Sequence, residues 1–221
     1  MLYNRDTCPV LRLYGTRVPF GELVRETVIA NSASGEGRRP LRADAQQNRE
    51  RLLEVAYLAF ASEGLSVSVH EIARRAGVST GTLSRHFPSK ADLYEAIVHD
   101  RVRRLVNQAH ELRDTMSADE AFFGFFRIMA DASASDRGLA DSLLGDGFDI
   151  EAAASGTGHD LMGALRSLLA AAQDVGAVGP DIDTADVKAL ISACSGHGDD
   201  DPKARNRMVA VVCDGLRASA R

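Results

Sequence analysis

The chain has 221 residues, of which 26 are Lys or Arg, 31 are Asp or Glu and 45% are hydrophobic, which excludes a disordered or collagen-like protein. Its three cysteines are odd in number and widely spaced, which argues against a disulfide framework and favours a reducing compartment. No uncharged stretch approaches the roughly 18 residues that a membrane-spanning helix needs, and arginines stand where an export signal has its apolar core. We therefore expect a cytoplasmic protein with no membrane association.

The charges are distributed unevenly along the chain. Residues 42–113 contain 11 basic and 9 acidic residues, whereas residues 114–221 contain 9 basic and 18 acidic ones. A mildly basic region followed by an acidic one predicts an anion-binding module joined to a module that does not bind anions.

Residues 1–41 show no sustained helical periodicity, and positions 31–40 are rich in Ser, Gly and Arg. We expect a flexible N-terminal extension. Its basic residues Arg38 and Arg39, with Arg42 just beyond, fit an arm in the minor groove of DNA. A solvated tail or translation from an upstream start fits them as well, and the low-complexity composition favours these two readings.

Apolar periodicity beyond this extension predicts an all-α chain. A helix is expected over residues 47–62, where apolar residues recur at helical spacing on one face. Ser68 and Glu71 form a capping-box pattern that opens a second helix. A tight turn at Gly77 then leads to a third, short helix that Ser79 opens.

Later segments repeat this pattern of cap, apolar stripe and breaker. A long helix is predicted over residues 91–112, and a phenylalanine-rich helix follows the capping-box pair Ser117 and Glu120. The glycine-rich region 132–158 predicts a loose segment with a short helix at 138–144. Further helices are expected at 161–175, 184–194 and 202–218.

The segment from 68 to 97 carries the clearest functional pattern. Two helices this short are stable only when packed against the helix of residues 47–62, which gives a three-helix unit. The residues expected to pack there are Ile72, Ala73, Val78, Leu83 and Phe87. The second helix of the pair then projects hydrogen-bond donors outward, and no acidic residue occurs between Gly77 and Ala91. Such a surface is typical of a helix that reads the major groove of DNA.

Residues 48–97 resemble the DNA-binding domain of the TetR (tetracycline repressor) family of bacterial transcription regulators, in the runs RERLLEVAYLAFASEG, IARRAGVSTGTL and HFPSKADLYEAI. Weaker similarity to the ligand-binding half of such regulators continues at 175–190 and 213–218. The resemblance implies an all-helical homodimer that binds operator DNA until a small-molecule effector releases it. We accordingly expect three regions in the chain. They are a flexible extension (1–41), a helix-turn-helix domain (42–90) and a ligand-binding and dimerisation domain (91–221) connected through the helix 91–112.

The resemblance also implies roles for individual residues. It gives Thr80, Thr82, Arg85 and His86 contacts to bases and phosphates, and gives Lys90 a phosphate contact at a helix start, where exposed amides favour anions. The full candidate DNA-binding set is Ser68, Ser79, Thr80, Thr82, Ser84, Arg85, His86 and Lys90. Ser84 stands where the family usually has Tyr, so a bulky contact to the DNA backbone is missing.

Two further sets of apolar residues are candidates for other contacts. We expect the phenylalanine cluster to pack in the core or in a dimer contact. The alternative is that part of the cluster lines a ligand pocket. The candidate pocket residues are Phe122, Phe125, Phe126, Met129, Met162 and Leu165. We expect the ligand between the helices of residues 118–175, and the acidic charge there favours a neutral or cationic one. The candidate dimer-interface residues on the last two helices are Leu190, Ile191, Met208, Val212 and Leu216.

Other possible chemistry is weakly supported. Cys194 and His197 near three aspartates lack the paired spacing of a structural zinc site, and His159 beside Asp160 has no GxSxG motif nearby. We expect no catalytic residue, metal or cofactor. The alternative function is a helical-bundle enzyme or small-molecule carrier that retains the three-helix unit as a scaffold. An enzyme has no reason to keep the acid-free, donor-rich surface from Thr80 to Lys90, so a ligand-responsive DNA-binding repressor is favoured.

Overall fold

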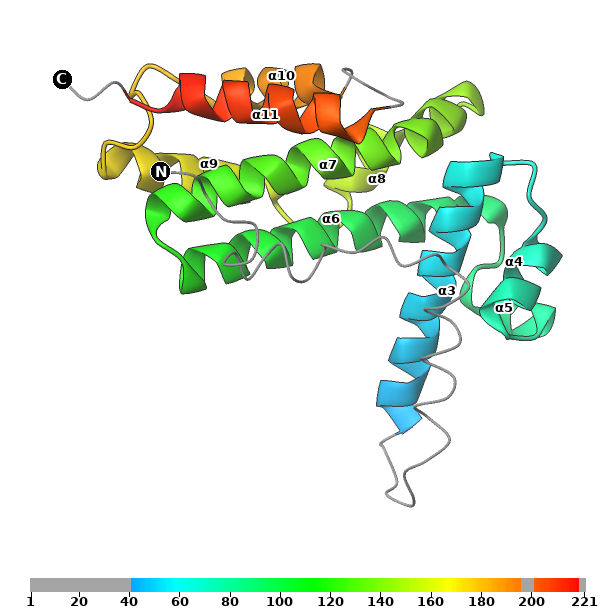
Figure 1. The fold of residues 1–221 in the computed structure, drawn as a ribbon. Coiled ribbons are helices and arrows are strands. Elements are labelled where there is room, and N and C mark those ends of the chain that lie inside the picture. The colour runs from blue at the N-terminus through cyan, green and yellow to red at the C-terminus, as the bar shows by residue number, and fades with distance from the viewer. Residues whose placement is uncertain (1–40, 196–200, 219–221) are drawn as a thin grey trace. The chain divides into compact units, whose positions relative to one another are not determined.

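A computed structural model describes residues 41–195 and 201–218 (Figure 1). The regular elements of these residues are α-helices. One isolated β-bridge joins Val178 to Arg217. The helices are α3 (Leu41–Glu63), α4 (Val69–Ala76), α5 (Thr80–His86), α6 (Lys90–Thr115), α7 (Ala118–Gly145), α8 (Ile150–Ser155), α9 (Leu161–Asp174), α10 (Thr184–Ser195) and α11 (Pro202–Leu216). In the described part of the chain no helix is long and apolar enough to cross a membrane.

Helices α3, α4 and α5 form a helix-turn-helix unit around one apolar core. The predicted packing residues Ile72, Ala73, Leu83 and Phe87 are buried in this core, and Val78 packs at its edge, as the sequence predicts. The core continues onto the first turns of α6 through Leu93, Tyr94 and Ile97. Because a helix of seven residues such as α5 is unstable alone, this burial is what holds it in place.

The remaining helices form a bundle. Helix α6 begins at a complete capping box, in which Ser89 and Asp92 satisfy each other's backbone amides. Helix α7 packs along α6, α9 and α10, and α11 contacts α7 and α10 (Figure 1). The phenylalanines of α7 fill the middle of the bundle, and Phe122, Phe125 and Phe126 are fully buried.

The expectation of a loose segment at 132–158 is wrong for most of its length. Helix α7 runs without interruption to Gly145, and a separate helix α8 follows. Leu139 and Leu143 are buried in the same core as the helix-turn-helix unit, so long-range packing stabilises a stretch whose local sequence is poor in apolar residues. Gly138 lies against the end of α3, where a Cβ would make an ordinary contact of 3.5 Å with the carbonyl oxygen of Ala61.

Charged side chains tie α3 to α6. Asp100 on α6 is buried and is paired with Arg103 and Arg104, one turn further along the same helix. These two arginines also reach across to α3, where their guanidinium groups lie 3.5 Å from the carboxylates of Glu50 and Glu54. A buried carboxylate is tolerated only when it is paired in this way, so Asp100 organises the arginines that face α3.

Candidate functional site

A tight turn sets the direction of α5 relative to α4. Gly77 adopts a left-handed conformation with φ of 70°, and its amide and that of Val78 donate to carbonyls in the last turn of α4. Ser79 then caps α5 by accepting a hydrogen bond from the amide of Thr82 at 3.0 Å. Ser68 caps α4 in the same manner through the amide of Glu71 at 3.2 Å. Ser68 and Ser79 therefore act first as helix caps.

Polar side chains of α5 point away from the core. Leu83 is the buried residue of this helix, whereas Ser84, Arg85 and His86 are exposed. Within the described part of the chain, the side chains of Thr80, Ser84 and Arg85 have no hydrogen-bond partner. The hydroxyl of Thr82 is engaged with that of Ser79 at 2.8 Å. Helix α5 thus presents free hydrogen-bond donors on an exposed surface.

Two carboxylates of the helix-turn-helix unit are paired with arginines of α4. Arg74 and Arg75 both donate to the carboxylate of Glu71, and these hydrogen bonds lower the pKa of Glu71 to about 2. Arg75 also binds Glu63 at the end of α3 and lowers the pKa of that carboxyl. With these pairs formed, the carboxylates of Glu63 and Glu71 oppose an approaching anion less than free carboxylates would.

Lys90 is placed differently from the expectation of a phosphate contact. Its ammonium donates to the backbone carbonyl of Leu65 and lies over the rings of Phe60 and Tyr94, 5.5 and 6.0 Å from their centroids. The physical reason is that the loop after α3 leaves a carbonyl oxygen within reach of a lysine at the start of α6, and the two aromatic faces attract the cation. In this arrangement Lys90 binds the end of the loop after α3 and contacts the aromatic core, and a phosphate contact by its ammonium stays a prediction.

Two arginines of α3 that were not among the candidate residues lie beside the helix-turn-helix. The guanidinium carbon of Arg49 lies 5.6 Å from the ring centroid of Phe87, at the end of α5. The Nη2 atom of Arg51 would lie 3.9 Å from a Cβ placed on Gly77, so it sits at the turn. Both are visible in the sequence as arginines of the first helix, but only the packing of α3 against α5 shows that they join this surface.

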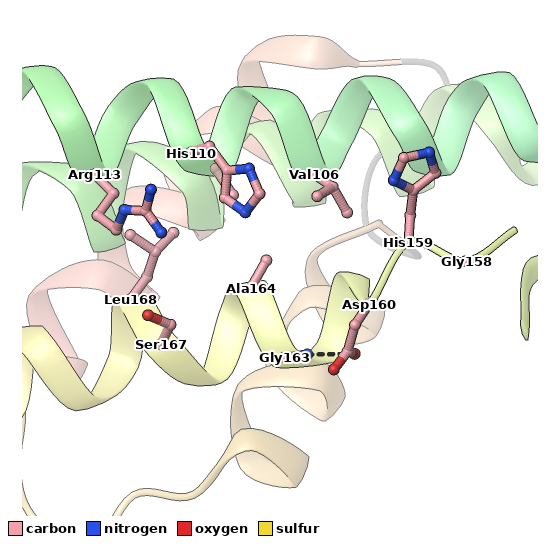
Figure 2. A pocket seen from close by; sticks show the side chains of 11 residues that line it. Val106, His110, Arg113, Gly158, His159, Asp160, Gly163, Ala164, Ser167 and Leu168 are labelled. Atoms are coloured by element: carbon pink, nitrogen blue, oxygen red, sulfur yellow. Dashed lines mark hydrogen bonds between the residues drawn. The ribbon is translucent and has the colours of Figure 1, made fainter.

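A pocket of 420 Å³ lies between α6 and the start of α9 (Figure 2). Its walls are one stripe of each helix, including Val106, His110 and Arg113 from α6 and Ala164 and Leu168 from α9. Figure 2 shows Arg113, His110 and Val106 in sequence along α6, with the ring of His159 at the opposite end from Arg113. The long helix α6 therefore lines the pocket directly, whereas the sequence placed the ligand between later helices.

A second, smaller pocket of 150 Å³ brings together three of the six predicted pocket residues. Met129 from α7 and Met162 and Leu165 from α9 line it, together with residues of α10. Phe122, Phe125 and Phe126 line neither of these two pockets and are buried with no exposed surface, so their part in ligand binding stays a prediction. Large rings fill space between helices, whereas cavities remain where the facing residues are small.

The five candidate dimer residues fall into two groups. Ile191 and Leu216 are buried within the chain itself, at 4% and 6% exposure, and leave little surface for a partner. The other three, Leu190, Met208 and Val212, are partly exposed. Val211 on α11 was not among the candidate residues, yet it is an apolar side chain that is 70% exposed.

Several other expectations concern residues outside the described ranges. His197 and two of the three aspartates beside it, and the arginines Arg38 and Arg39, are among them. Among the residues that the structure does describe, no group of three or more His, Cys, Asp or Glu side chains is arranged to hold a metal ion.

Comparison with protein families identifies both halves of the chain. Residues 52–97 match the family described as bacterial regulatory proteins, tetR family, and residues 117–218 match the family described as transcriptional regulator SbtR-like, C-terminal domain. An HTH-type transcriptional regulator of Staphylococcus aureus is 34% identical over 80 residues, which are 36% of this chain and 43% of that protein. The chain thus aligns with less than half the length of this curated relative.

Solved structures resemble the chain over most of its length. A TetR transcription regulatory protein from Mycobacterium vanbaalenii is 48% identical with a TM-score of 0.69, over 81% of this chain and 100% of that one. A TetR transcriptional regulator from Streptomyces coelicolor is 31% identical with a TM-score of 0.67, over 78% of this chain and 99% of that one. The likeness covers the helix-turn-helix unit and the bundle together.

Proposed function

This chain belongs to the TetR family of bacterial transcriptional regulators, and from that membership we propose that it is a repressor that binds a palindromic operator as a homodimer and is released by a small molecule. In this proposal it acts on DNA in the cytoplasm and is not an enzyme. Its domains are the helix-turn-helix domain up to residue 90 and the ligand-binding and dimerisation domain from residue 91 onward.

The observation that carries the proposal is the exposed, acid-free face of α5. Arg85 in the last turn of α5 supplies its arginine, and a planar guanidinium forms two hydrogen bonds with a guanine edge in the major groove. Thr80, Ser84 and His86 offer further donors and acceptors for bases and phosphates. Arg49 and Arg51 add positive charge beside the turn and the end of α5, where they are suited to phosphates of the flanking backbone.

Dimerisation follows from the small size of this reading surface. One helix of seven residues buries too little surface for the affinity of a specific operator complex, and a two-fold dimer places two such helices about 34–36 Å apart on one face of the duplex. We assign the contact to α10 and α11, with Val211 as its most exposed apolar side chain and Leu190, Met208 and Val212 around it.

Helix α6 is suited to transmit ligand binding. Its 26 residues span about 39 Å at 1.5 Å per residue. Three residues separate it from the end of α5, and it lines the larger pocket near its other end. A tilt of α6 on ligand binding would change the separation of the two α5 helices, and a dimer then loses one of its half-sites. The ligand must accordingly bind the released state more tightly than the operator-bound state.

Selection of bound sequences from random duplex DNA tests the proposal. The full chain is expected to enrich a two-fold symmetric sequence, and Arg85→Ala is expected to relax the preference at one position of each half-site, at a cost of about 1–3 kcal/mol. The matched control Arg166→Gln removes an exposed cation from α9 and should leave the selected sequence unchanged. A chain that enriches no sequence would contradict the proposal.

A further inference from the structure

The pocket between α6 and α9 combines an apolar floor with a polar rim. Val106, Ala109 and Leu168 form the floor and are buried. His110 and Arg113 stand on the rim from α6, and both are exposed. A molecule entering from solvent therefore meets hydrogen-bonding groups first and an apolar surface below them, which is the usual build of a small-molecule site.

Small residues keep this pocket open. Ala109 on α6 faces the start of α9, where Gly163 and Ala164 line the same space. A larger side chain at Gly163 would displace the carboxylate of Asp160 that caps α9, because a Cβ there would collide with it. The pocket is thus a consequence of the backbone and its cap, and does not depend on the rotamer of a long side chain.

Negative charge at the rim is already engaged, whereas donors are free. Asp160 accepts a hydrogen bond from the amide of Gly163 at 2.7 Å. Asp114, next to the pocket, pairs with Arg113 at 2.9 Å in an exposed contact. The imidazoles of His110 and His159 have no hydrogen-bond partner among the described residues. The groups at the rim that remain available for hydrogen bonds are therefore the two imidazoles and the guanidinium N–H groups of Arg113 that Asp114 does not bind.

We propose that this pocket binds a small organic carboxylate with an apolar tail. The carboxylate lies between His110 and Arg113, the tail rests on Val106 and Leu168, and His159 closes the far end (Figure 2). This proposal deepens the regulatory function proposed above by naming the chemical class of its effector. It also departs from the expectation of a neutral or cationic ligand, which followed from the net charge of residues 114–221 and not from the groups at the site.

The pair between Arg113 and Asp114 does not prevent such binding. Both side chains are at least half exposed, and exposed ion pairs contribute little because water screens them. A ligand carboxylate beside the apolar floor is less screened, so Arg113 gains by turning toward it. Charge-assisted hydrogen bonds of this type are about twice as strong as neutral ones.

Ligand binding should be coupled to proton uptake. The charged and titratable groups facing the site are His110, Arg113 and Asp114 from α6, and His159 and Asp160 from the start of α9. A bound anion favours the protonated form of an adjacent imidazole, and histidine is the side chain that changes charge near neutral pH. Affinity for the carboxylate should therefore fall as the pH rises from 6 to 8, while affinity for a neutral analogue stays constant.

Isothermal titration of the full chain without DNA tests this assignment. The probes are benzoate, 4-phenylbutyrate and octanoate, each compared with its own amide at pH 6 and pH 8. At least one carboxylate is expected to bind about tenfold more tightly than its amide at pH 6. His110→Gln and Arg113→Gln should each weaken carboxylate binding about tenfold and leave amide binding unchanged.

Arg166→Gln is the control, because Arg166 is an exposed cation of α9 that does not line the pocket. The assignment is overturned if no carboxylate exceeds its amide, or if the preference survives in the double variant of His110 and Arg113. Because no DNA is present, loss of this result leaves sequence selection by α5 untouched. Failure of sequence selection likewise leaves carboxylate binding standing.

Discussion

The phenol of Tyr57 on α3 donates a hydrogen bond of 2.7 Å to the carboxylate of Asp136 on α7. The same carboxylate pairs with Arg101 on α6 at 2.9 Å, and that guanidinium carbon lies 4.6 Å from the centroid of the Tyr57 ring. Burial and the bond to Asp136 raise the pKa of Tyr57, so its hydroxyl remains a donor. One carboxylate thereby joins the helix-turn-helix unit, the long helix α6 and the bundle.

Tyr57→Phe removes this donor and leaves Asp136 with Arg101 as its remaining partner. We expect the free energy of unfolding in urea to fall by about 1–2 kcal/mol. Tyr94→Phe is the matched control, because the Tyr94 hydroxyl is buried without a hydrogen-bond partner among the described residues. That substitution removes an unsatisfied group and should cost nothing. Equal losses for the two variants would show that the bond to Asp136 adds no stability.

Gly77→Ala should destabilise the chain by about 1–2 kcal/mol, since Gly77 has a positive φ that alanine adopts at a cost. Gly81 provides the opposite case inside α5. A Cβ there would make an ordinary contact at 3.8 Å with the hydroxyl of Ser79, and alanine favours a helix by roughly 1 kcal/mol over glycine. The midpoint of thermal unfolding should fall for Gly77→Ala and rise for Gly81→Ala. A lower midpoint in both variants would contradict the helical conformation of Gly81.

Glu71 should titrate far below an ordinary glutamate. Hydrogen bonds from Arg74 and then Arg75 lower its pKa to about 2 from an ordinary value of 4.5. Because the pKa is depressed by folding, the stabilisation is present above pH 4.5 and is lost as the pH falls toward 2. The carboxyl carbon of Glu71, followed by NMR, should show this low midpoint at low salt. A midpoint for Glu71 near the ordinary value of 4.5 would contradict the pairing.

Substitution of Lys90 and Arg51 should separate structural from electrostatic roles. Lys90→Ala removes the bond to Leu65 and the aromatic contacts, so it is expected to lower the free energy of unfolding by about 1–2 kcal/mol. Arg51→Ala should leave stability nearly unchanged and reduce the salt dependence of DNA binding by about one unit. If Lys90→Ala instead reduces the salt dependence of DNA binding, Lys90 contacts a phosphate as the sequence predicts.

Val211→Asp should weaken the proposed homodimer. Placing a carboxylate in an apolar contact is costly, and light scattering should report a shift toward monomer at micromolar concentration. Val175→Asp is the matched control, because this valine at the end of α9 is 63% exposed and lies outside the proposed contact. A wild-type chain that is monomeric and still binds a palindromic site would remove the basis of this prediction.

The helix-turn-helix was predictable because its determinants are local. Ser68, Gly77 and Ser79 fix helix ends within a few residues of themselves, and their spacing is legible without any partner. Helix α7 beyond residue 132 was not predictable in this way, since Leu139 and Leu143 are buried against residues 52–97, which lie far earlier in the chain.

Site chemistry was less predictable than the fold, for the same reason. Nothing near Lys90 in the sequence indicates that the carbonyl of Leu65 lies within its reach. The pocket between α6 and α9 likewise depends on which faces of two distant helices oppose each other. Phenylalanines attract attention in a sequence, whereas the alanines and glycine that leave the space empty do not.

Helix α5 contributes a single buried side chain, Leu83, to the core, and its other six residues lie at or near the surface. Exposed positions in a short helix can change with little effect on folding. The recognition sequence of this protein can therefore drift, or be redesigned, almost independently of the scaffold that carries it. Related regulators that share these buried positions but control different genes should therefore differ at residues 80, 84, 85 and 86.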